Sequence, residues 1–418
     1  MFSKNKIIYI VLMGLSALLS IVKLTLFSSI LGPEEYGLYS LVLSTYIFIV
    51  YLGGLGLNEA IIKLGSKAYG KQEFKYILKL RDISIFYSIL LAVFFSIVFF
   101  IVINFIQIDN KVYNSLLLSI FLAISALEFN LMDAFLRVQH RFVSYSLMLF
   151  SKSFLVVLTG YFIAPIYKAN GVIWVEIVSF FIIFIVVLFY NKNERFCFSH
   201  LKNSLDFVTD AIKNGIAILS SNIIRNLTLN IDKWAITSSL GLVSLGKYSF
   251  SMIIYMMAIF SLGLITTVLG PKWLSEFSSF NNSKILLDKI NKVIILVVIS
   301  GILVFLLFIF YLQSFLNTFY PDYSDITIYK TILIIFLGLL FQIPVFLYDW
   351  FFIAVSNEKF VLKMTFNMFM ITFIMILLCW YFKTSIIYFA LVFTIVRIYI
   401  LTHYLVYIYK KFAVKDYN

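Results

Sequence analysis

The residues best suited to bind a polar ligand lie in one segment, GIAILSSNIIRNLTLNIDKWAI at 215–236. Four of its polar residues are spaced four, four and three positions apart, which places them on one face of an α-helix. They are Asn222, Asn226, Asn230 and Lys233. Amide groups donate and accept hydrogen bonds, and the lysine adds a positive charge. Because lipid cannot satisfy such a stripe, the segment is expected to line a polar cavity.

Ionisable residues also interrupt apolar segments. Arg225 and Asp232 share a neighbouring face of the same helix, and Lys23, Glu128 and Arg397 lie in other apolar segments. An ionised group at mid-bilayer costs about 2.5–3.5 kcal/mol, so it normally faces the protein interior or a hydrated cavity. We expect the three basic residues to line a cationic cavity with the stripe above, and the two carboxylates to serve gating or ion coupling. The alternative is a set of static ion pairs that only hold helices together.

Twelve helices are expected to position these residues. The chain of 418 residues is 62% hydrophobic and 13% charged, and apolar runs of about 18 residues or more can cross a bilayer. A spanning segment must satisfy its own backbone polar groups, which favours helices and predicts an all-α polytopic membrane protein. The predicted spans are 7–31, 38–62, 83–106, 114–136, 146–166, 170–190, 214–238, 247–269, 291–316, 328–352, 361–382 and 386–408.

The basic residues predict the orientation of these spans. With the N-terminus placed in the cytoplasm, most of the 33 lysines and arginines fall in cytoplasmic loops, Lys152 being counted among them. Both termini are therefore expected to be cytoplasmic. The net charge of +13 then reflects topology and attraction to anionic membrane lipid rather than nucleic-acid binding.

The two halves of the chain resemble each other. Nine residues recur as the same type 209 positions later: Leu31, Gly32, Gly37, Tyr39, Ser40, Tyr46, Gly54, Leu55 and Lys63. Two six-helix lobes, 1–200 and 201–418, are therefore predicted, related by a parallel pseudo-two-fold. The same shift takes Lys23 onto Asp232, and we expect these opposite charges to approach each other across the lobe interface.

Sites for catalysis, metals or cofactors are not predicted. The chain has no phosphate-binding glycine loop, and its two cysteines, Cys197 and Cys379, have no metal-ligand spacing. The predicted outer loops are too short for a membrane glycosyltransferase or polymerase, which remains a distant alternative. We expect a protein that is not an enzyme.

Several motifs follow one another in a characteristic order. They are LGPEEYGLYSL (31–41), GGLGLNEAIIK (53–63), RVQHRFVSYS (137–146), Asp232-Lys233, LGKYSF (245–250) and PDYSD (321–325). Together they resemble the Wzx-type polysaccharide flippases of the multidrug/oligosaccharidyl-lipid/polysaccharide exporter superfamily. The LGKYSF copy departs from LGPEEYG because it has neither the proline nor the acidic pair.

The resemblance implies a transporter of the bacterial cytoplasmic (inner) membrane. Its substrate would be undecaprenyl-pyrophosphate carrying one oligosaccharide unit, such as an O-antigen repeat for lipopolysaccharide, moved to the periplasmic leaflet by alternating access. Cationic residues would face the pyrophosphate, and the asparagines would face sugar hydroxyls. A proton or sodium gradient, or consumption of the product, would supply energy, and other polysaccharide-assembly proteins are expected partners. The alternative is a cation-coupled multidrug exporter of the same superfamily.

Overall fold

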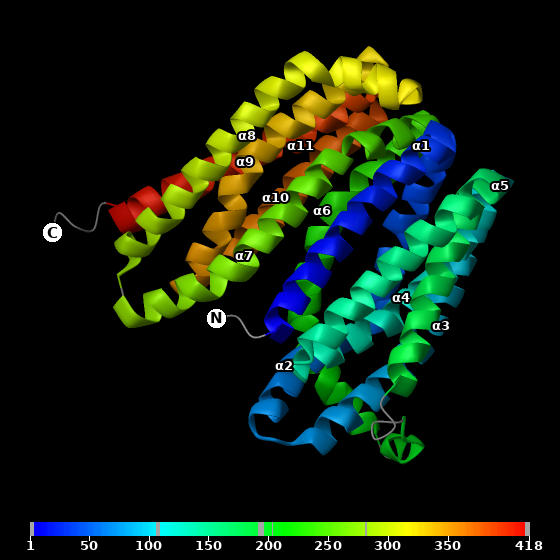
Figure 1. The fold of residues 1–418 in the computed structure, drawn as a ribbon, viewed down its shortest axis with the longest axis vertical. Coiled ribbons are helices and arrows are strands. Elements are labelled where there is room, and N and C mark those ends of the chain that lie inside the picture. The colour runs from blue at the N-terminus through cyan, green and yellow to red at the C-terminus, as the bar shows by residue number, and fades with distance from the viewer. Residues whose placement is uncertain (1–3, 106–108, 191–195, 203, 281, 414–418) are drawn as a thin grey trace. The chain divides into compact units, whose positions relative to one another are not determined.

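The computed structural model describes residues 4–105, 109–190, 196–202, 204–280 and 282–413, and all regular structure in these ranges is helical (Figure 1). The α-helices are α1 (Lys4–Gly54), α2 (Leu57–Gly70), α3 (Phe74–Phe105), α4 (Asn110–Val138), α5 (Phe142–Tyr190), α6 (Leu205–Ser251), α7 (Ile253–Phe280), α8 (Ser283–Phe319), α9 (Ile326–Ala354), α10 (Glu358–Tyr381) and α11 (Ile386–Ile408). A short 3₁₀ turn, η2 (Phe198–Leu201), precedes α6.

Three long helices are interrupted by a single residue with non-helical backbone. These residues are Gly32 in α1, Lys168 in α5 and Gly241 in α6. Nine helices in the described ranges are long and apolar enough to cross a membrane, and the three interruptions divide them into twelve spans. The predicted all-α membrane protein with twelve helices is therefore confirmed.

The interruptions at Gly32 and Gly241 have nearly the same backbone geometry. Their φ/ψ values are 68°/174° and 83°/178°, a region that is essentially restricted to glycine. The two glycines are 209 residues apart, as the internal repeat requires. Each unit of the chain therefore opens with the same glycine-dependent break between two helical spans.

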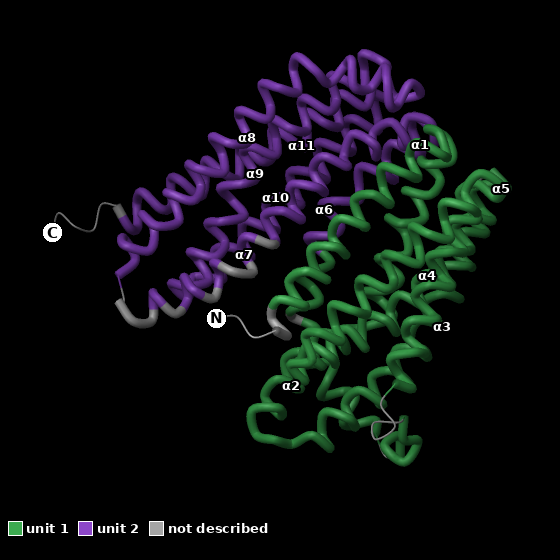
Figure 2. Tube along the Cα trace, viewed as in Figure 1, with its two compact units in different colours: residues 1–223 green, residues 224–418 purple. Residues whose placement is uncertain are grey.

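The chain divides into two compact units, residues 1–223 and 224–418, with the boundary inside α6 (Figure 2). In the first unit, α1 packs most extensively against α5; in the second, α9 packs most extensively against α11. The lobes predicted at 1–200 and 201–418, and their pseudo-two-fold relation, stay predictions.

The outward faces of the helices are apolar, and charged side chains are found inside. Leu296 and Phe310 of α8 are 69% and 75% exposed, whereas Arg81 and Arg397 are almost completely buried. Large exposed apolar surfaces of this kind are typical of an interface with lipid rather than water. Together with the nine apolar helices, this distribution indicates a multi-pass membrane protein.

Candidate functional site

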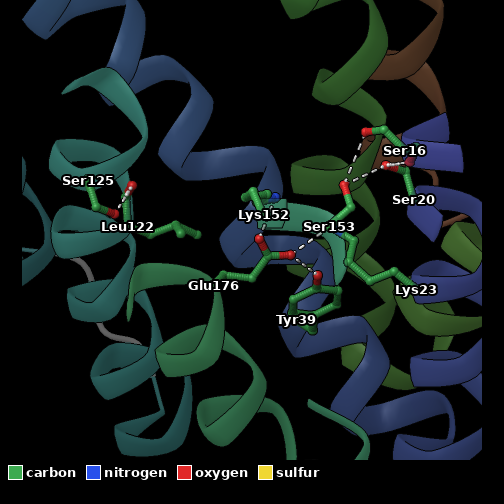
Figure 3. A network of polar contacts seen from close by, with 9 residues as sticks. All are labelled: Ser16, Ser20, Lys23, Tyr39, Leu122, Ser125, Lys152, Ser153 and Glu176. Atoms are coloured by element: carbon green, nitrogen blue, oxygen red, sulfur yellow. Dashed lines mark hydrogen bonds and ion pairs between the residues drawn. The ribbon is translucent and has the colours of Figure 1, made fainter. Parts of the chain in front are cut away.

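A buried ionic cluster in the first unit is centred on Glu176, in the part of α5 that follows Lys168 (Figure 3). Its carboxylate is 1% exposed and accepts a hydrogen bond of 2.6 Å from Lys23 Nζ. Lys152 Nζ lies 2.9 Å from the other carboxylate oxygen, and Tyr39 OH donates over 2.9 Å. Two ammonium groups therefore share one carboxylate, which leaves the cluster with a net positive charge.

Three hydroxyl groups border this cluster and show how α1 faces α5. Ser153 Oγ lies 3.5 Å from Ser16 Oγ and 3.4 Å from Ser20 Oγ (Figure 3). Ser16, Ser20 and Lys23 lie four and three residues apart, so they share one face of α1. That face is the one packed against α5, which explains why an apolar helix carries a polar stripe here.

Two members of the cluster were misjudged in the sequence. Lys152 was assigned to a cytoplasmic loop, but it lies inside α5, its side chain is only 15% exposed, and its ammonium packs over the ring of Phe180. Glu176 was not among the site residues predicted from the sequence. The position of Lys152, several residues inside an apolar helix, was the feature of the sequence that could have indicated this buried cluster.

A second set of charged residues surrounds a cavity of about 150 Å³ inside the second unit. Arg225 of α6 and Arg397 of α11 both line it, so the structure brings together two of the predicted cationic residues. The polar groups that complete the lining include Tyr255, Gln342, Asp349 and Tyr404. Tyr404 OH donates to Asp349 Oδ1 over 2.6 Å, which holds the carboxylate at the wall of the cavity.

Arg397 is held with part of its guanidinium unused. The residue is 2% exposed, its guanidinium carbon lies 3.7 Å from the centre of the Phe393 ring, and Nη1 donates to the Phe393 carbonyl over 3.3 Å. Nε has no hydrogen-bond partner within the described parts of the chain. A buried donor left without a partner is costly, and because Nε is itself buried, a ligand acceptor would reach it only after the side chain moves.

The predicted stripe of α6 is divided between the units. Asn222 lies in the first unit and donates to Glu59 Oε1 over 3.1 Å. In the second unit, Asn230 Nδ2 donates to the carbonyl of Asn226 over 2.9 Å, and Lys233 Nζ donates to Asn230 Oδ1 over 3.1 Å. The three residues of the second unit therefore form a continuous polar ladder along one helix face.

The two predicted coupling carboxylates lie in different units. Asp232 is 5% exposed and accepts a hydrogen bond of 2.6 Å from Tyr248 OH. Glu128 is 4% exposed, and its Oε1 accepts a hydrogen bond of 2.7 Å from Ser88 Oγ. Its Oε2 has no hydrogen-bond partner among the residues described. The predicted approach of Lys23 to Asp232 joins the two units and stays a prediction; inside its own unit, Lys23 pairs with Glu176.

The described residues contain no group of three or more histidine, cysteine, aspartate or glutamate side chains that could hold a metal ion. The side chains that these clusters do contain form ion pairs and hydrogen bonds. Guanidinium groups, ammonium groups and amides are suited to recognise phosphate and hydroxyl groups.

Comparison with known proteins identifies the family and the fold of this chain. The chain matches the family model described as polysaccharide biosynthesis protein over residues 2–278. No curated protein sequence matches it. Among solved structures, lipid II flippase MurJ in its inward closed conformation gives a TM-score of 0.78 at 16% identity, covering 98% of this chain and 89% of that one.

Two further structures have the same fold. An inward-facing multidrug resistance MATE family transporter of the MOP superfamily gives a TM-score of 0.73 at 14% identity, covering 98% of this chain and 96% of that one. A MOP superfamily transporter from Pyrococcus furiosus gives 0.64 at 13% identity, covering 96% and 94%. The family resemblance predicted from the ordered motifs is confirmed: this chain belongs to the polysaccharide biosynthesis protein family and has the fold of the MOP superfamily transporters.

Proposed function

We propose that this protein is a flippase that moves an undecaprenyl-pyrophosphate-linked oligosaccharide, an O-antigen or similar repeat unit, from the cytoplasmic to the periplasmic leaflet. It would act in the bacterial cytoplasmic membrane with both termini in the cytoplasm. The family to which the chain belongs supports a role in polysaccharide assembly. The fold that it shares with MurJ, named as a lipid II flippase, supports transport of a lipid-linked sugar.

The observation that carries this proposal is the pair of arginines in the second unit. Arg225 and Arg397 line one cavity, and a guanidinium can bind phosphate oxygens through two parallel hydrogen bonds. The buried Nε of Arg397, which has no hydrogen-bond partner in the described structure, would become a further donor once the side chain moves to expose it. Asn226 and Asn230 lie on the same helix as Arg225 and would offer amides to sugar hydroxyls.

The first unit would contribute to transport if one of its buried lysines left the Glu176 carboxylate and bound the substrate instead. Lys23 and Lys152 both bind Glu176 within 3 Å, so one ammonium could leave the carboxylate while the other still neutralises it. A pyrophosphate that takes up the released ammonium would bind one arrangement of the unit better than the other. Such a differential affinity is what a ligand needs to shift a conformational equilibrium.

Coupling to a proton or sodium gradient would use a buried carboxylate. Glu128 is suited to this because one of its oxygens is buried and has no hydrogen-bond partner in the described structure. Asp232 is a weaker candidate because Tyr248 and the backbone amide of Lys233 already occupy its oxygens. Consumption of the product in the periplasm would be the alternative source of energy.

Depletion of the protein in its native host tests the proposal. Loss of the flippase should cause lipid-linked repeat units to accumulate on the cytoplasmic face while sugar synthesis continues. Surface polysaccharide should fall and return when the wild-type gene is restored. Unchanged surface polysaccharide after complete depletion would contradict the proposal.

The MATE-like fold favours one second candidate, a cation-coupled multidrug exporter. A cationic drug calls for an excess of carboxylates, whereas the clusters around Arg397 and Glu176 contain more cationic than anionic groups. The depletion strain separates the candidates, because an exporter predicts increased sensitivity to cationic drugs with normal surface polysaccharide.

A further inference from the structure

The cavity of about 150 Å³ in the second unit is small for a binding site. Ligand pockets typically have volumes of about 300–1,000 Å³, so this space can take one anionic group, such as a phosphate, rather than a whole lipid-linked sugar. Its walls come from α6, α7, α9, α10 and α11. All of these lining residues belong to the second unit, so their geometry is that of one compact part of the chain.

Arg225 is the cation of this cavity that a ligand can reach. The residue is exposed, whereas Arg397 is only 2% exposed. Within the described ranges of the chain, the guanidinium of Arg225 forms no hydrogen bond or ion pair. A guanidinium can bind two oxygens of one phosphate through parallel hydrogen bonds. Arg225 therefore offers the first contact for an anion that enters the cavity.

A carboxylate lines the same small space. Asp349 of α9 is partly exposed, and it lies close enough to Arg225 for the two charges to interact electrostatically. In the described structure the two side chains nevertheless form no ion pair. Two guanidinium groups and one carboxylate thus line the cavity, and the carboxylate removes part of its positive charge.

Tyr404 of α11 explains why the opposite charges of Asp349 and Arg225 stay apart. Its hydroxyl donates to Asp349 Oδ1 over 2.6 Å. The tyrosine itself is 2% exposed, and its ring centre lies 5.4 Å from that of Phe352 and 5.3 Å from that of Phe360. A buried tyrosine packed between other rings has little freedom to move. The carboxylate is therefore held in one orientation, beside the guanidinium but not on it.

This arrangement opposes the retention of an anion. Like charges repel each other more strongly where the surroundings are less polar than water, so the charge of Asp349 weakens the binding of a phosphate at Arg225. Sites along a transport pathway must bind strongly enough to load a ligand and weakly enough to release it. Two arginines without a neighbouring carboxylate would favour loading at the expense of release.

We propose that Asp349, oriented by Tyr404, limits how tightly the cavity formed by Arg225 and Arg397 holds an anion. The inference rests on the proposed function, in which the anion is the pyrophosphate of a lipid-linked sugar. It assigns opposite effects to two residues that touch each other. The charge of Asp349 lowers the affinity, whereas the hydroxyl of Tyr404 raises it by keeping the carboxylate away from Arg225.

Binding of inorganic pyrophosphate to the purified full-length protein, measured by isothermal titration calorimetry in detergent, tests this inference. Asp349→Asn keeps the shape of the side chain and the acceptor for Tyr404 but removes the charge, so pyrophosphate should bind about 3- to 10-fold more tightly. Asp349→Glu keeps the charge and should not increase the affinity. Asp288→Asn is the matched control, because Asp288 is an exposed carboxylate of α8 outside the cavity. It should change the affinity by less than about twofold, since exposed charges at a distance are screened by salt.

Tyr404→Phe should have the opposite effect. It keeps the ring packing but frees Asp349 to pair with Arg225, so pyrophosphate should bind about two- to fivefold more weakly. Adding Asp349→Asn to this variant should restore tight binding, because no carboxylate then remains to occupy Arg225. Thermal unfolding in detergent checks that each variant is folded, and the two single variants test the inference independently.

The inference is overturned if Asp349→Asn weakens pyrophosphate binding or leaves it unchanged, or if Asp288→Asn tightens it as much. It is also overturned if neither the wild type nor Asp349→Asn binds pyrophosphate. These outcomes are distinct from those of the depletion experiment, because inorganic pyrophosphate carries neither lipid nor sugar. Unchanged surface polysaccharide after depletion would contradict the flippase, whereas the effects of Asp349 and Tyr404 on anion binding would still stand or fall by calorimetry.

Discussion

The two units keep the same buried tyrosine but exchange the charges around it. Tyr39 donates to Glu176 in the first unit, and Tyr248, which is 209 residues later, donates to Asp232 in the second. The shift of 209 takes Lys23 of the first cluster onto Asp232 of the second. The cation of the first unit is therefore replaced by an anion, and the second unit carries its buried cation, Arg397, in its last helix.

The same exchange occurs at the start of two other helices. In the first unit, Lys111 of α4 pairs with Glu34 and Glu35 of the LGPEEYG motif at 2.6 and 2.8 Å. In the second, Lys247 of LGKYSF pairs with Asp325, the residue that caps α9, at 3.1 Å. LGKYSF lacks the acidic pair of LGPEEYG, but its Lys247 forms an ion pair with Asp325 in place of the pair that Glu34 and Glu35 form with Lys111. Because the Coulomb energy depends on the product of two charges, a pair keeps its attraction when both signs reverse.

The units differ in whether their buried charges are closed off. Glu176 is saturated by two lysines and a tyrosine, whereas Arg397 lines a cavity with Nε unbonded within the described residues. We infer that the first cluster mainly holds helices in place and that the second is the better ligand site. The predictions below separate these roles.

The largest effect is expected for Glu176→Ala. This change leaves Lys23 and Lys152 buried without their carboxylate, and breaking a buried ion pair in this way costs about 3–5 kcal/mol. Thermal unfolding in detergent should show a strong loss of stability. The exchanged pair Lys23→Glu with Glu176→Lys should recover much of it, since the second unit uses reversed signs. If the exchanged pair restores no stability, the location of each charge matters more than the presence of an oppositely charged pair.

Arg397→Ala should reduce transport rather than abundance. Removing this buried guanidinium from the cavity wall should lower export by about 10- to 100-fold, in line with the loss of one charge-assisted contact to phosphate. Surface polysaccharide and protein level are measured in the depletion strain. Lys383→Gln, an exposed cation of the second unit, is the control. If abundance falls in step with export, Arg397 has a structural role like that of Glu176.

Gly241→Ala tests the shared helix break. No atom lies within 4 Å of the added Cβ, so the expected cost of about 1–3 kcal/mol comes from backbone strain at positive φ. Gly14→Ala is the matched control, because its Cβ would also meet nothing and its helical backbone predicts a gain of about 0.5–1 kcal/mol. Equal unfolding temperatures for the two variants would remove the argument that the break requires glycine.

The smallest effect concerns the pH dependence of the Asp325 pair. Hydrogen bonds from the Thr327 amide and Lys247 lower the pKa of Asp325 below its usual value of 3.8. A carboxyl whose pKa is lower in the folded state stabilises the protein above the unfolded pKa, and this stability is lost as pH falls through the folded value. The pair is exposed, so Asp325→Asn should remove at most about 1 kcal/mol at neutral pH. A difference from wild type that persists at pH 2 would argue against this origin.

Local features of the sequence were sufficient for the architecture. Hydropathy located the spans, and the observed breaks at Gly32, Lys168 and Gly241 fall between spans predicted as separate. The repeat at 209 residues also anticipated that two of these breaks would match. Helical spacing correctly put Asn226, Asn230 and Lys233 on one face, because periodicity is a property of a single helix.

Partner choice was decided only by the tertiary structure. Nothing in the local sequence connects Lys152 with Glu176, or Arg225 with Arg397, because each pair joins different spans of the chain. Asn222 likewise bonds to Glu59 rather than continuing the ladder of its own helix. Hydropathy determines that a segment crosses the membrane, but the rotation and depth of each helix determine which side chains meet. Those two quantities depend on how all the helices of a unit pack together.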